Sequence, residues 1–510
     1  MDELKERCSS LIDKLILKYK NDEHMLKQLD IHVNQNLEQI LTDECASHET
    51  KQKIARSLEA QQTNFVKVFL SKNRYYYLSQ DDAECFFEYD GKHYTVTKRD
   101  DINTKLLVTI SNYKDLHEWK FEVTDMIMQN IKNRSLHNTV PESYTIQYVL
   151  KLLSPTVFSS RDTAKYFLTV LGDSILKKNK DNIYLPFGKH KGLLANLENY
   201  AYTTIGHSGL TKNFVKYHEN HNYSNCRLIH FEGERQGELS VNQALDLFCV
   251  ACHYSTRFNG ADEYISKKAG QTLKDYTLFV TSKTQEDIVN DFGDSMIDVI
   301  SEASPSQLTY ILKMKDMHFL WKNYMDNLKI PNIVYQSTVK QLLINKYEFN
   351  SDTECFVKIA SKHIPMVRKF IEFWETNIII SQGEELELDE LCILFKSENG
   401  SIDESYALNI IYHFFPQSIV VDHKYLLHIS CKLWDKKKDM ENAMLKMKNM
   451  YKNKNTQEYI SFDDAYQYYY FEYKPKFIAS KRYFEKFIVD YVKNFIVYGT
   501  FISNDWYMTN

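Results

Sequence analysis

Apolar side chains recur at intervals of three and four residues through the first 70 positions of the chain. Leu4, Cys8 and Leu11 begin this pattern, which is that of an amphipathic helix, and the segments 23–41 and 46–71 continue it. The apolar spacing drifts from one segment to the next. This drift favours short helices in a helical hairpin or three-helix unit over one long coiled coil.

Residues 74–102 change to the alternation of a β-strand. The run RYYYLSQ is rich in aromatic residues, and FFEYDGKHYTV alternates on either side of Asp90-Gly91. An Asp-Gly pair suits the two-residue type I′ turn of a β-hairpin. Residues 1–103 are therefore predicted to combine N-terminal helices with a small β-hairpin element.

Residues 104–380 show a succession of helical patterns. Ser159 or Ser160 precedes RDTAKYFLTVLGDSILKK, and Ser304-Pro305 precedes another helical run, so each serine is a candidate N-cap. The segment CRLIHFEG at 226–233 reads as one short strand within this region. Helices joined in pairs by short loops predict a helical bundle or an α-solenoid, although no clean sequence period is present.

The last third of the chain reads as two modules of similar order. Residues 384–434 give two helices followed by an alternating hairpin, the order of a winged helix, and residues 459–510 repeat it. A lysine-rich linker or helix at 435–458 joins them. The predicted fold is therefore predominantly α, with a small N-terminal β-hairpin element and winged-helix-like modules at the C-terminal end.

Composition supports a helical protein with packed cores. The 510 residues include only 14 glycines and 8 prolines, which disfavours turn-rich sandwiches and propellers. The apolar fraction of 43% argues against wholesale disorder. Lysine outnumbers arginine by 52 to 11, a skew that favours A/T-rich codons.

Charge and cysteine usage bear on partners and compartment. The net charge of −5 gives no global attraction to nucleic acid, so binding must come from local basic patches. Nine scattered cysteines are typical of a reducing compartment. The charged N-terminus and the lack of an apolar run of 18 residues predict an intracellular protein that does not enter a membrane.

Three basic segments are candidate nucleic-acid sites. In the first, cations stand beside tyrosines that could stack on bases, although tyrosines alternating along a strand also fill cores. The second is the lysine-rich connection, which as a solvated linker would bind nothing. The third begins what would be a recognition helix, but winged helices also dock proteins. The residues are Lys72, Arg74, Tyr75 and Tyr77 in the first segment, Lys436, Lys437, Lys438, Lys446 and Lys448 in the second, and Lys481, Arg482 and Lys486 in the third.

The third segment carries the sharpest prediction. Ser480 is expected to cap a helix over 480–493, with its apolar residues buried and its cations exposed to phosphate. Acidic residues crowd the start of the first winged-helix-like module, at 384–390, and argue against that module lying on phosphate.

One group of histidines and cysteines has the donor types of a zinc site. These weak candidates are His218, His221, Cys226 and Cys252. Cys249 and Cys252 lie three apart in the apolar run LDLFCVACHY, where cysteines usually pack in a core. No phosphate-binding glycine loop occurs in the sequence. We therefore expect no catalytic residues, no cofactor and no enzymatic activity.

Several stretches together resemble a conserved, uncharacterised family of proteins from mimivirus-like giant DNA viruses. They are FFEYDGKHYTVTKRDDI, TVFSSRDTAKYFLTVLGDSILKKN, KYHENHNYSNCRLI, ACHYSTRFNGADEYI and SKRYFEKFIVDYV. The resemblance extends over most of the chain, and it implies expression in the host cytoplasm, in a viral factory. Replication, transcription or translation of viral genes is the context that it implies.

The leading hypothesis is a non-enzymatic helical adaptor or scaffold of giant-virus gene expression, including a scaffold of translation initiation. It would bind nucleic acid, with RNA favoured over DNA, and other viral gene-expression proteins. An alternative is a DNA-binding accessory protein of replication or transcription, related to the C-terminal regions of primase-helicases. A zinc-binding protein and a structural protein of the virion remain further alternatives.

Overall fold

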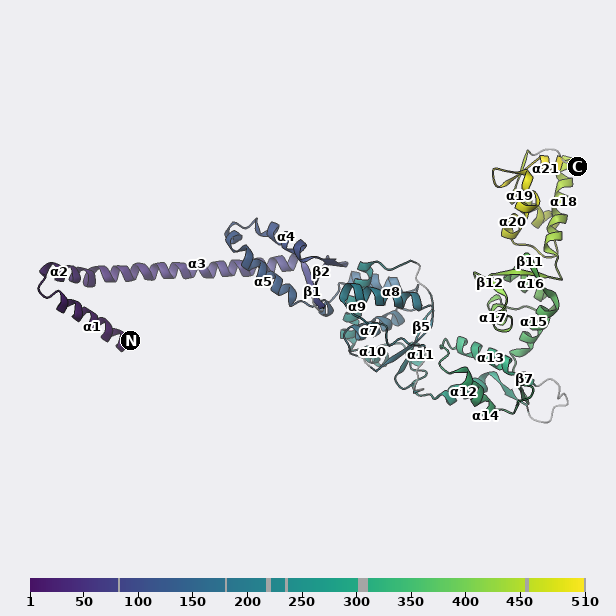
Figure 1. The fold of residues 1–510 in the computed structure, drawn as a ribbon, viewed down its shortest axis with the longest axis horizontal. Coiled ribbons are helices and arrows are strands. Elements are labelled where there is room, and N and C mark those ends of the chain that lie inside the picture. Colours follow the sequence, from purple (N-terminus) through teal and green to yellow (C-terminus); the bar gives the residue numbers. More distant parts are fainter. Residues whose placement is uncertain are drawn as a thin grey trace. The chain divides into compact units, whose positions relative to one another are not determined.

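The computed structural model describes residues 1–80, 83–178, 181–216, 222–233, 237–300, 311–454 and 458–508. Helices predominate, as the sequence predicts (Figure 1). The chain divides into two compact units whose boundary lies between Ser282 and Lys283. This boundary falls inside the range 104–380 that the sequence indicated as one helical region. Among the described residues, no helix is long and apolar enough to cross a bilayer.

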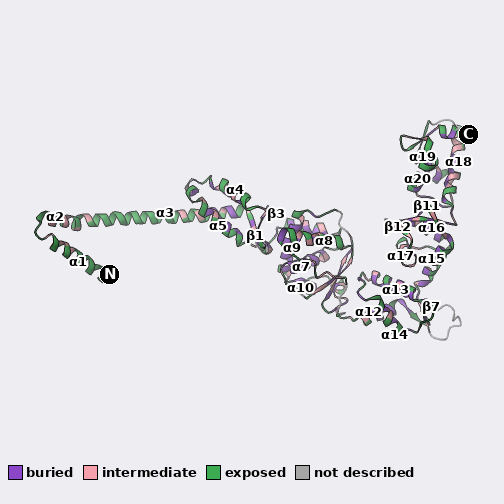
Figure 2. Ribbon diagram, in the orientation of Figure 1, coloured by how far each residue is buried: buried purple, intermediate pink, exposed green. Residues whose placement is uncertain are grey.

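The first unit begins with helices that bury little. They are α1 (Asp2–Lys18), α2 (Glu23–Ile31), a π-helical turn at His32–Asn36, and α3 (Leu37–Lys72). None of the residues in α1, α2 or the turn is buried, and α3 buries residues only near its end, from Phe65 onward (Figure 2). The expected break between the segments 23–41 and 46–71 is wrong, because α3 continues through 36 residues from Leu37 to Lys72 without a turn.

A three-stranded antiparallel sheet follows α3. Its strands are β1 (Arg74–Gln80), β2 (Ala83–Tyr89) and β3 (Tyr94–Thr97), in that spatial order. Tyr89 pairs with Tyr94, so the connection between β2 and β3 has four residues, and the predicted two-residue turn is wrong. The Asp90 side chain accepts hydrogen bonds of 2.7 Å from the backbone N–H groups of Lys92 and His93, which closes this wider loop.

The sheet joins two helical layers. The end of α3 packs with α4 (Arg99–Ile110) and α5 (Lys120–Lys132) around a core that includes Phe69, Leu106 and Ile127. On the other side, Asp246 of α9 (Val241–Phe258) accepts a 2.8 Å hydrogen bond from the backbone N–H of Tyr94 and lies 2.7 Å from His93 Nδ1. A buried carboxylate thus fixes the β2–β3 loop against α9.

Helix α9 is the central helix of the first unit. It contacts α6 (Ser143–Leu153), α7 (Arg161–Ile175), α8 (Lys191–Ile205) and α10 (Ala261–Lys267). This is a bundle around one buried helix, and α11 (Gln271–Thr277) lies beside it against β5 (Cys226–Phe231). Ser160 caps α7 by accepting a hydrogen bond from the Thr163 backbone, which confirms one of the two predicted caps.

The predicted strand at 226–233 is present as β5. It pairs in parallel with β4 (Ile183–Gly188), and α8 connects the two strands. The sequence did not predict β4, because its central residues are buried on both faces and so do not alternate with polar ones. A short apolar run of this kind does not distinguish a strand from a helix. Ser304-Pro305, the other predicted cap, lies outside the described residues.

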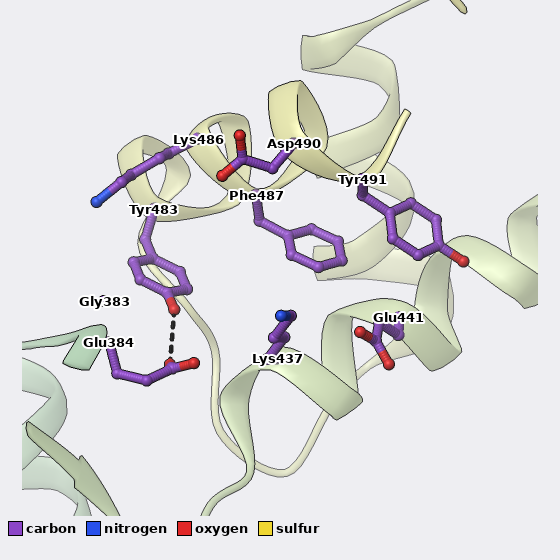
Figure 3. Close-up of a pocket in the computed structure, with 9 residues that line it drawn as sticks. All are labelled: Gly383, Glu384, Lys437, Glu441, Tyr483, Lys486, Phe487, Asp490 and Tyr491. Atoms are coloured by element: carbon purple, nitrogen blue, oxygen red, sulfur yellow. Dashed lines mark hydrogen bonds between the residues drawn. The ribbon is translucent and has the colours of Figure 1, made fainter. Parts of the chain in front are cut away.

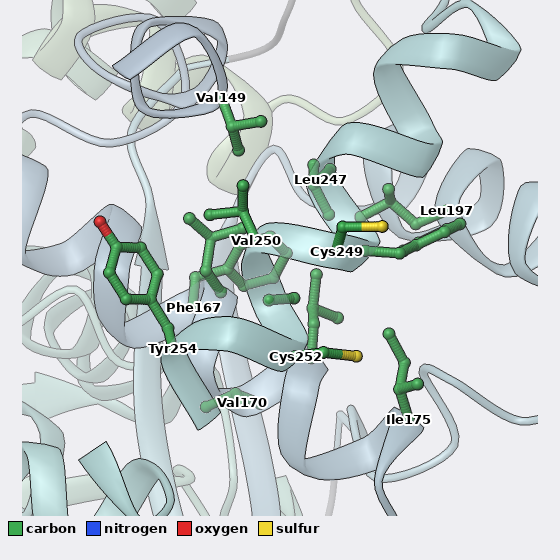
Figure 4. Close-up of a cluster of buried hydrophobic side chains, with 14 of the residues drawn as sticks. Val149, Phe167, Val170, Ile175, Leu197, Leu247, Cys249, Val250, Cys252 and Tyr254 are labelled. Carbon is green, nitrogen blue, oxygen red and sulfur yellow. The ribbon is translucent and has the colours of Figure 1, made fainter. Parts of the chain in front are cut away.

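The α7–α9 contact is the tightest part of this unit. A Cβ built on Gly172 of α7 would lie 2.1 Å from the backbone oxygen of Ala251 in α9, so only glycine allows the two helices to approach this closely. Around the crossing, Phe167, Cys249 and Cys252 are buried among aliphatic side chains (Figure 4). This apolar cluster is named the α7–α9 core below.

The second unit contains the same order of elements three times: helix, strand, helix, helix, strand, strand. In each repeat the last strand lies between the other two. The first repeat has α12 (Gln285–Met296), β7 (Ile311–Lys313), α13 (Met314–Asn327), α14 (Gln336–Lys346), β8 (Phe349–Asn350) and β9 (Cys355–Val357). A small extra pair, β6 (Asp298–Val299) with β10 (Ile359–Ala360), accompanies it.

The other two repeats follow without a break. The second has α15 (Ile364–Asn377), β11 (Ile378–Glu387), α16 (Leu388–Asn399), α17 (Glu404–Phe414), β12 (Ile419–Val421) and β13 (Tyr425–Cys431). The third has α18 (Lys436–Lys454), β14 (Tyr459–Ser461), α19 (Phe462–Gln467) with a π-helical turn at Tyr468–Tyr473, α20 (Lys481–Tyr491), β15 (Ile496–Val497) and β16 (Phe501–Ser503), and α21 (Asp505–Met508) follows it. The lysine-rich segment is therefore the first helix of the third repeat.

Candidate nucleic-acid interface

The acidic segment at 384–390 lies at the contact between the second and third repeats. Glu384, Glu385 and Glu387 end β11, and Glu390 lies in the first turn of α16. The Glu387 backbone N–H donates a 2.9 Å hydrogen bond to Glu390 Oε2, which is half of a capping box. The helix start thus places several carboxylates on one small surface. We call these glutamates and the cations that meet them the charged junction.

Lys436 occupies the centre of the charged junction. Its Nζ lies 2.7 Å from Glu390 Oε2, and both side chains are only 3% exposed. The ammonium also lies 3.7 Å from the centre of the Tyr483 ring, a close cation–π contact. Burial lowers the pKa of Lys436, against the opposing effect of Glu390. Lys436 therefore cannot reach phosphate, and its prediction as a nucleic-acid contact is wrong.

The basic start of α20 meets the same glutamates. Arg482 is ion-paired with Glu385, and its guanidinium carbon lies 4.0 Å from the centre of the Tyr425 ring. Lys486 Nζ lies 3.3 Å from Glu385 Oε2. Lys481, outside the junction, is ion-paired with Asp463. The three cations predicted to face phosphate are thus already paired with carboxylates, which corrects that prediction.

Glu387 shows how completely the charged junction satisfies its carboxylates. It accepts the Ser480 hydroxyl hydrogen bond, and Lys424 Nζ lies 2.9 Å away. Burial alone would raise the pKa of Glu387, but the bonds from Ser480 and Lys424 and the Arg482 charge together lower it. Ser480 also caps α20 by accepting from the Tyr483 backbone N–H, as the sequence predicts. Ser480 therefore both caps α20 and donates a hydrogen bond to the acidic segment.

A pocket of about 390 Å³ opens beside the charged junction, between α18 and α20 (Figure 3). Lys437 and Lys486 line it, together with the carboxylates of Glu384, Glu441 and Asp490. Tyr483 donates a 2.9 Å hydrogen bond to Glu384 at one end. Three carboxylates outnumber two ammonium groups, so the pocket does not favour an anion.

The remaining cations of α18 lie outside the charged junction. Lys437, Lys438 and Lys446 are exposed and Lys448 is half-buried. Met440, Ala443, Met444 and Met447 form the buried side of the helix. Within the part of the chain that the structure describes, Lys437, Lys438 and Lys448 have no ion-pair partner, whereas Lys446 lies 4.9 Å from the Tyr473 ring centre. These lysines are the available cations of the second predicted segment.

The first predicted segment is mostly structural. Tyr75 is 1% exposed and stacks near Phe69, while Tyr77 packs against Phe86 with ring centres 5.2 Å apart. Arg74 lies 2.7 Å from Glu142 Oε1. Lys72, at the end of α3, is exposed. The stacking role predicted for the tyrosines is wrong, because alternate positions of β1 face the cores on its two sides.

The four residues predicted as weak zinc ligands do not form a metal site among the described residues. Cys226 and Cys252 are buried, and burial raises the pKa of Cys226 to about 11 and that of Cys252 to about 12, which disfavours the thiolate that zinc needs. His218 and His221 lie outside the described residues. Across the described ranges, no group of three or more His, Cys, Asp or Glu side chains is arranged to hold a metal ion.

What the sequence did not show is the pairing of two oppositely charged segments about 90 residues apart. Each segment was interpreted alone, the acidic one as repelling phosphate and the basic one as attracting it. A signal was present, since the four glutamates lie at or just before the start of α16 and the cations lie at the start of α20, so two oppositely charged clusters stand at helix starts.

No protein-family model matches this chain, and the search of curated proteins finds no match to it.

Proposed function

We propose that this protein is a non-enzymatic adaptor of giant-virus gene expression, built on tandem winged-helix-like modules. It binds RNA through α18 and holds protein partners on its other modules. The observation that carries the proposal is the set of lysines on α18, Lys437, Lys438 and Lys448, that have no ion-pair partner among the described residues, whereas the cations of α20 are all paired. The giant-virus context comes from the sequence resemblance described above.

The order of elements supports the winged-helix interpretation. Each repeat has a helix, a strand, two helices and a two-stranded wing whose last strand pairs with the first strand. In a DNA-binding winged helix the third helix enters the major groove. The corresponding helices here are α14, α17 and α20.

These third helices do not offer free cations. Lys340 and Lys346 of α14 pair with Glu354 and Asp294, and the N-terminus of α17 begins with acidic residues. The cations of α20 pair with Asp463 and with the charged junction. Recognition through the usual helix is therefore disfavoured in all three repeats, and the modules are better suited to docking proteins.

Helix α18 offers a different phosphate-binding surface. Lys437, Lys438 and Lys448 lie within about 100° of one another around the helix, at 100° per residue, and extend over about 16 Å of its length. Lysines at this spacing can each neutralise a phosphate along a nucleic-acid backbone, with release of counterions. Such contacts carry no sequence preference.

The test is binding of a fluorescent RNA duplex by fluorescence anisotropy at several salt concentrations. The wild type should bind, and its affinity should fall as salt rises. The variant K437E/K438E/K448E should bind RNA at least about tenfold more weakly. The slope of log K against log salt should also become less negative, by up to about 3. No binding at low salt, or an unchanged variant, would overturn the proposal.

A matched control comes from three exposed lysines in or just before the second repeat. Lys362, Lys369 and Lys396 are also exposed, so K362E/K369E/K396E changes the net charge equally. This variant should bind RNA as the wild type does. A parallel measurement with a DNA duplex tests the preference for RNA. Equal affinity for the two duplexes would contradict that preference.

A further inference from the structure

The middle of α3 is a helix with nothing packed on it. Every residue from Leu37 to Ser57 is exposed, including Leu37 at 46%, Leu41 at 57% and Ile54 at 63%. In proteins most of the stability of a helix comes from tertiary packing of its apolar face. Burial of this apolar stripe against a partner would therefore stabilise α3.

The stripe has a symmetrical composition. At 100° per residue, one face of α3 carries Leu37, Ile40 and Leu41 at one end, Ile54 and Leu58 at the other, and Glu44 and Lys51 between them. Neither charged residue has an ion-pair partner among the described residues. Read from either end toward Ser47 and His48, the order is apolar, charged and then small or polar, with opposite charges on the two sides.

We infer that this face binds the same face of a second copy of the chain, in antiparallel orientation about Ser47 and His48. That arrangement places Leu37 opposite Leu58 of the other copy and Leu41 opposite Ile54. It also places Glu44 opposite Lys51, twice, on either side of the symmetry axis. A parallel pair would instead oppose Glu44 to Glu44 and Lys51 to Lys51, so charge complementarity selects the antiparallel dimer.

The size of the surface fits a small coiled-coil contact. The segment from Leu37 to Leu58 covers about three heptads and about 33 Å of helix. Apolar pairs at both ends supply the burial, and the two Glu44–Lys51 pairs fix register and direction. The inference concerns only α3 and is independent of the function proposed for α18.

A charge-swap cycle on the full chain tests the dimer, with the mass in solution measured by sedimentation. The wild type should have twice the monomer mass of 60.4 kDa. E44K and K51E should each weaken the dimer at least about tenfold, because each turns two attractive pairs into repulsive ones. The double variant E44K/K51E should restore the wild-type affinity.

Controls use the opposite face of the same helix. Glu49 and Lys53 lie on that face, so E49K and K53E change charge equally but should leave the dimer intact. Since residues 37–57 are exposed, every variant should keep the melting temperature of the monomer fold. A wild type that stays monomeric up to about 100 µM overturns the inference, as do single swaps without effect or a double swap that fails to restore association.

Discussion

The α7–α9 core and the centre of the charged junction are both buried, but they are built from opposite chemistry. In the core, Phe167, Cys249 and Cys252 touch aliphatic side chains, and Gly172 allows the backbones to approach. In the junction, Lys436 and Glu390 are equally inaccessible, yet both carry charge. The core is stabilised roughly in proportion to the apolar area removed from water.

The stability of the junction depends on a balance between the cost of removing charges from water and the attraction between them. Taking Glu390 and Lys436 out of water is costly, and their attraction offsets that cost only while both are present. The core tolerates little change in volume, whereas the junction tolerates little change in charge. This difference means that the two regions should respond differently when one partner or both partners of a contact are changed.

The largest expected effect is at the junction. Glu390→Ala would leave the Lys436 ammonium buried without its carboxylate, and the free energy of unfolding should fall by about 3–5 kcal/mol. Urea denaturation monitored by circular dichroism measures this loss. The double change E390L/K436M removes both charges and should recover most of the stability. A double variant as unstable as the single one would show that charge pairing is not what holds this contact.

The next effect is in the core. Gly172→Ala places a methyl group 2.1 Å from the Ala251 carbonyl oxygen, so α7 and α9 must separate, at a cost of about 1–3 kcal/mol in the free energy of unfolding. Gly270→Ala is the matched control, because no atom lies within 4 Å of its added Cβ. The control should be neutral or slightly stabilising. Equal destabilisation by both changes would contradict the close approach of the helices.

A smaller effect is expected when the exposed side of the junction is reversed. In R482E/K486E, two new carboxylates face Glu385, and the melting temperature should fall by a few degrees, since these half-exposed pairs each contribute about 1 kcal/mol or less. RNA affinity should change little, because α18 is untouched. Loss of RNA binding without a lower melting temperature would instead restore α20 as the phosphate site. K362E/K369E again serves as the charge control.

The smallest effect is a pH dependence from Glu387. Its pKa is lower in the folded state than the ordinary value of 4.5, so its contribution is present above that value and is lost as the pH falls through the folded pKa. The free energy of unfolding of the wild type should therefore decline more steeply below about pH 4.5 than that of Glu387→Gln. Denaturation midpoints measured across this range compare the slopes. Parallel slopes would mean that the Glu387 carboxylate is not stabilised by its partners.

Local sequence predicted much of the architecture because the relevant signals act over a few residues. Ser160 and Ser480 are N-caps as expected, β5 is a strand, and Phe484 and Ile488 are buried on α20. The aromatic run at β1 was ambiguous, since strand alternation does not tell a stacking surface from a core. The wider β2–β3 loop and the unbroken α3 also depend on contacts and register that no short window contains.

The sequence by itself determined that this protein is predominantly helical, where α7 and α20 begin, and which face of α20 is apolar. Those properties follow from propensity, capping and periodicity within one or two turns. Only the tertiary structure decided which charges are free. Arg482 meets Glu385 across 97 positions of sequence, and Lys436 meets Glu390 across 46, so cations that looked like phosphate contacts are neutralised by one acidic segment. A cation's partner is chosen by the folded chain, because Coulomb attraction depends on distance in space and on burial.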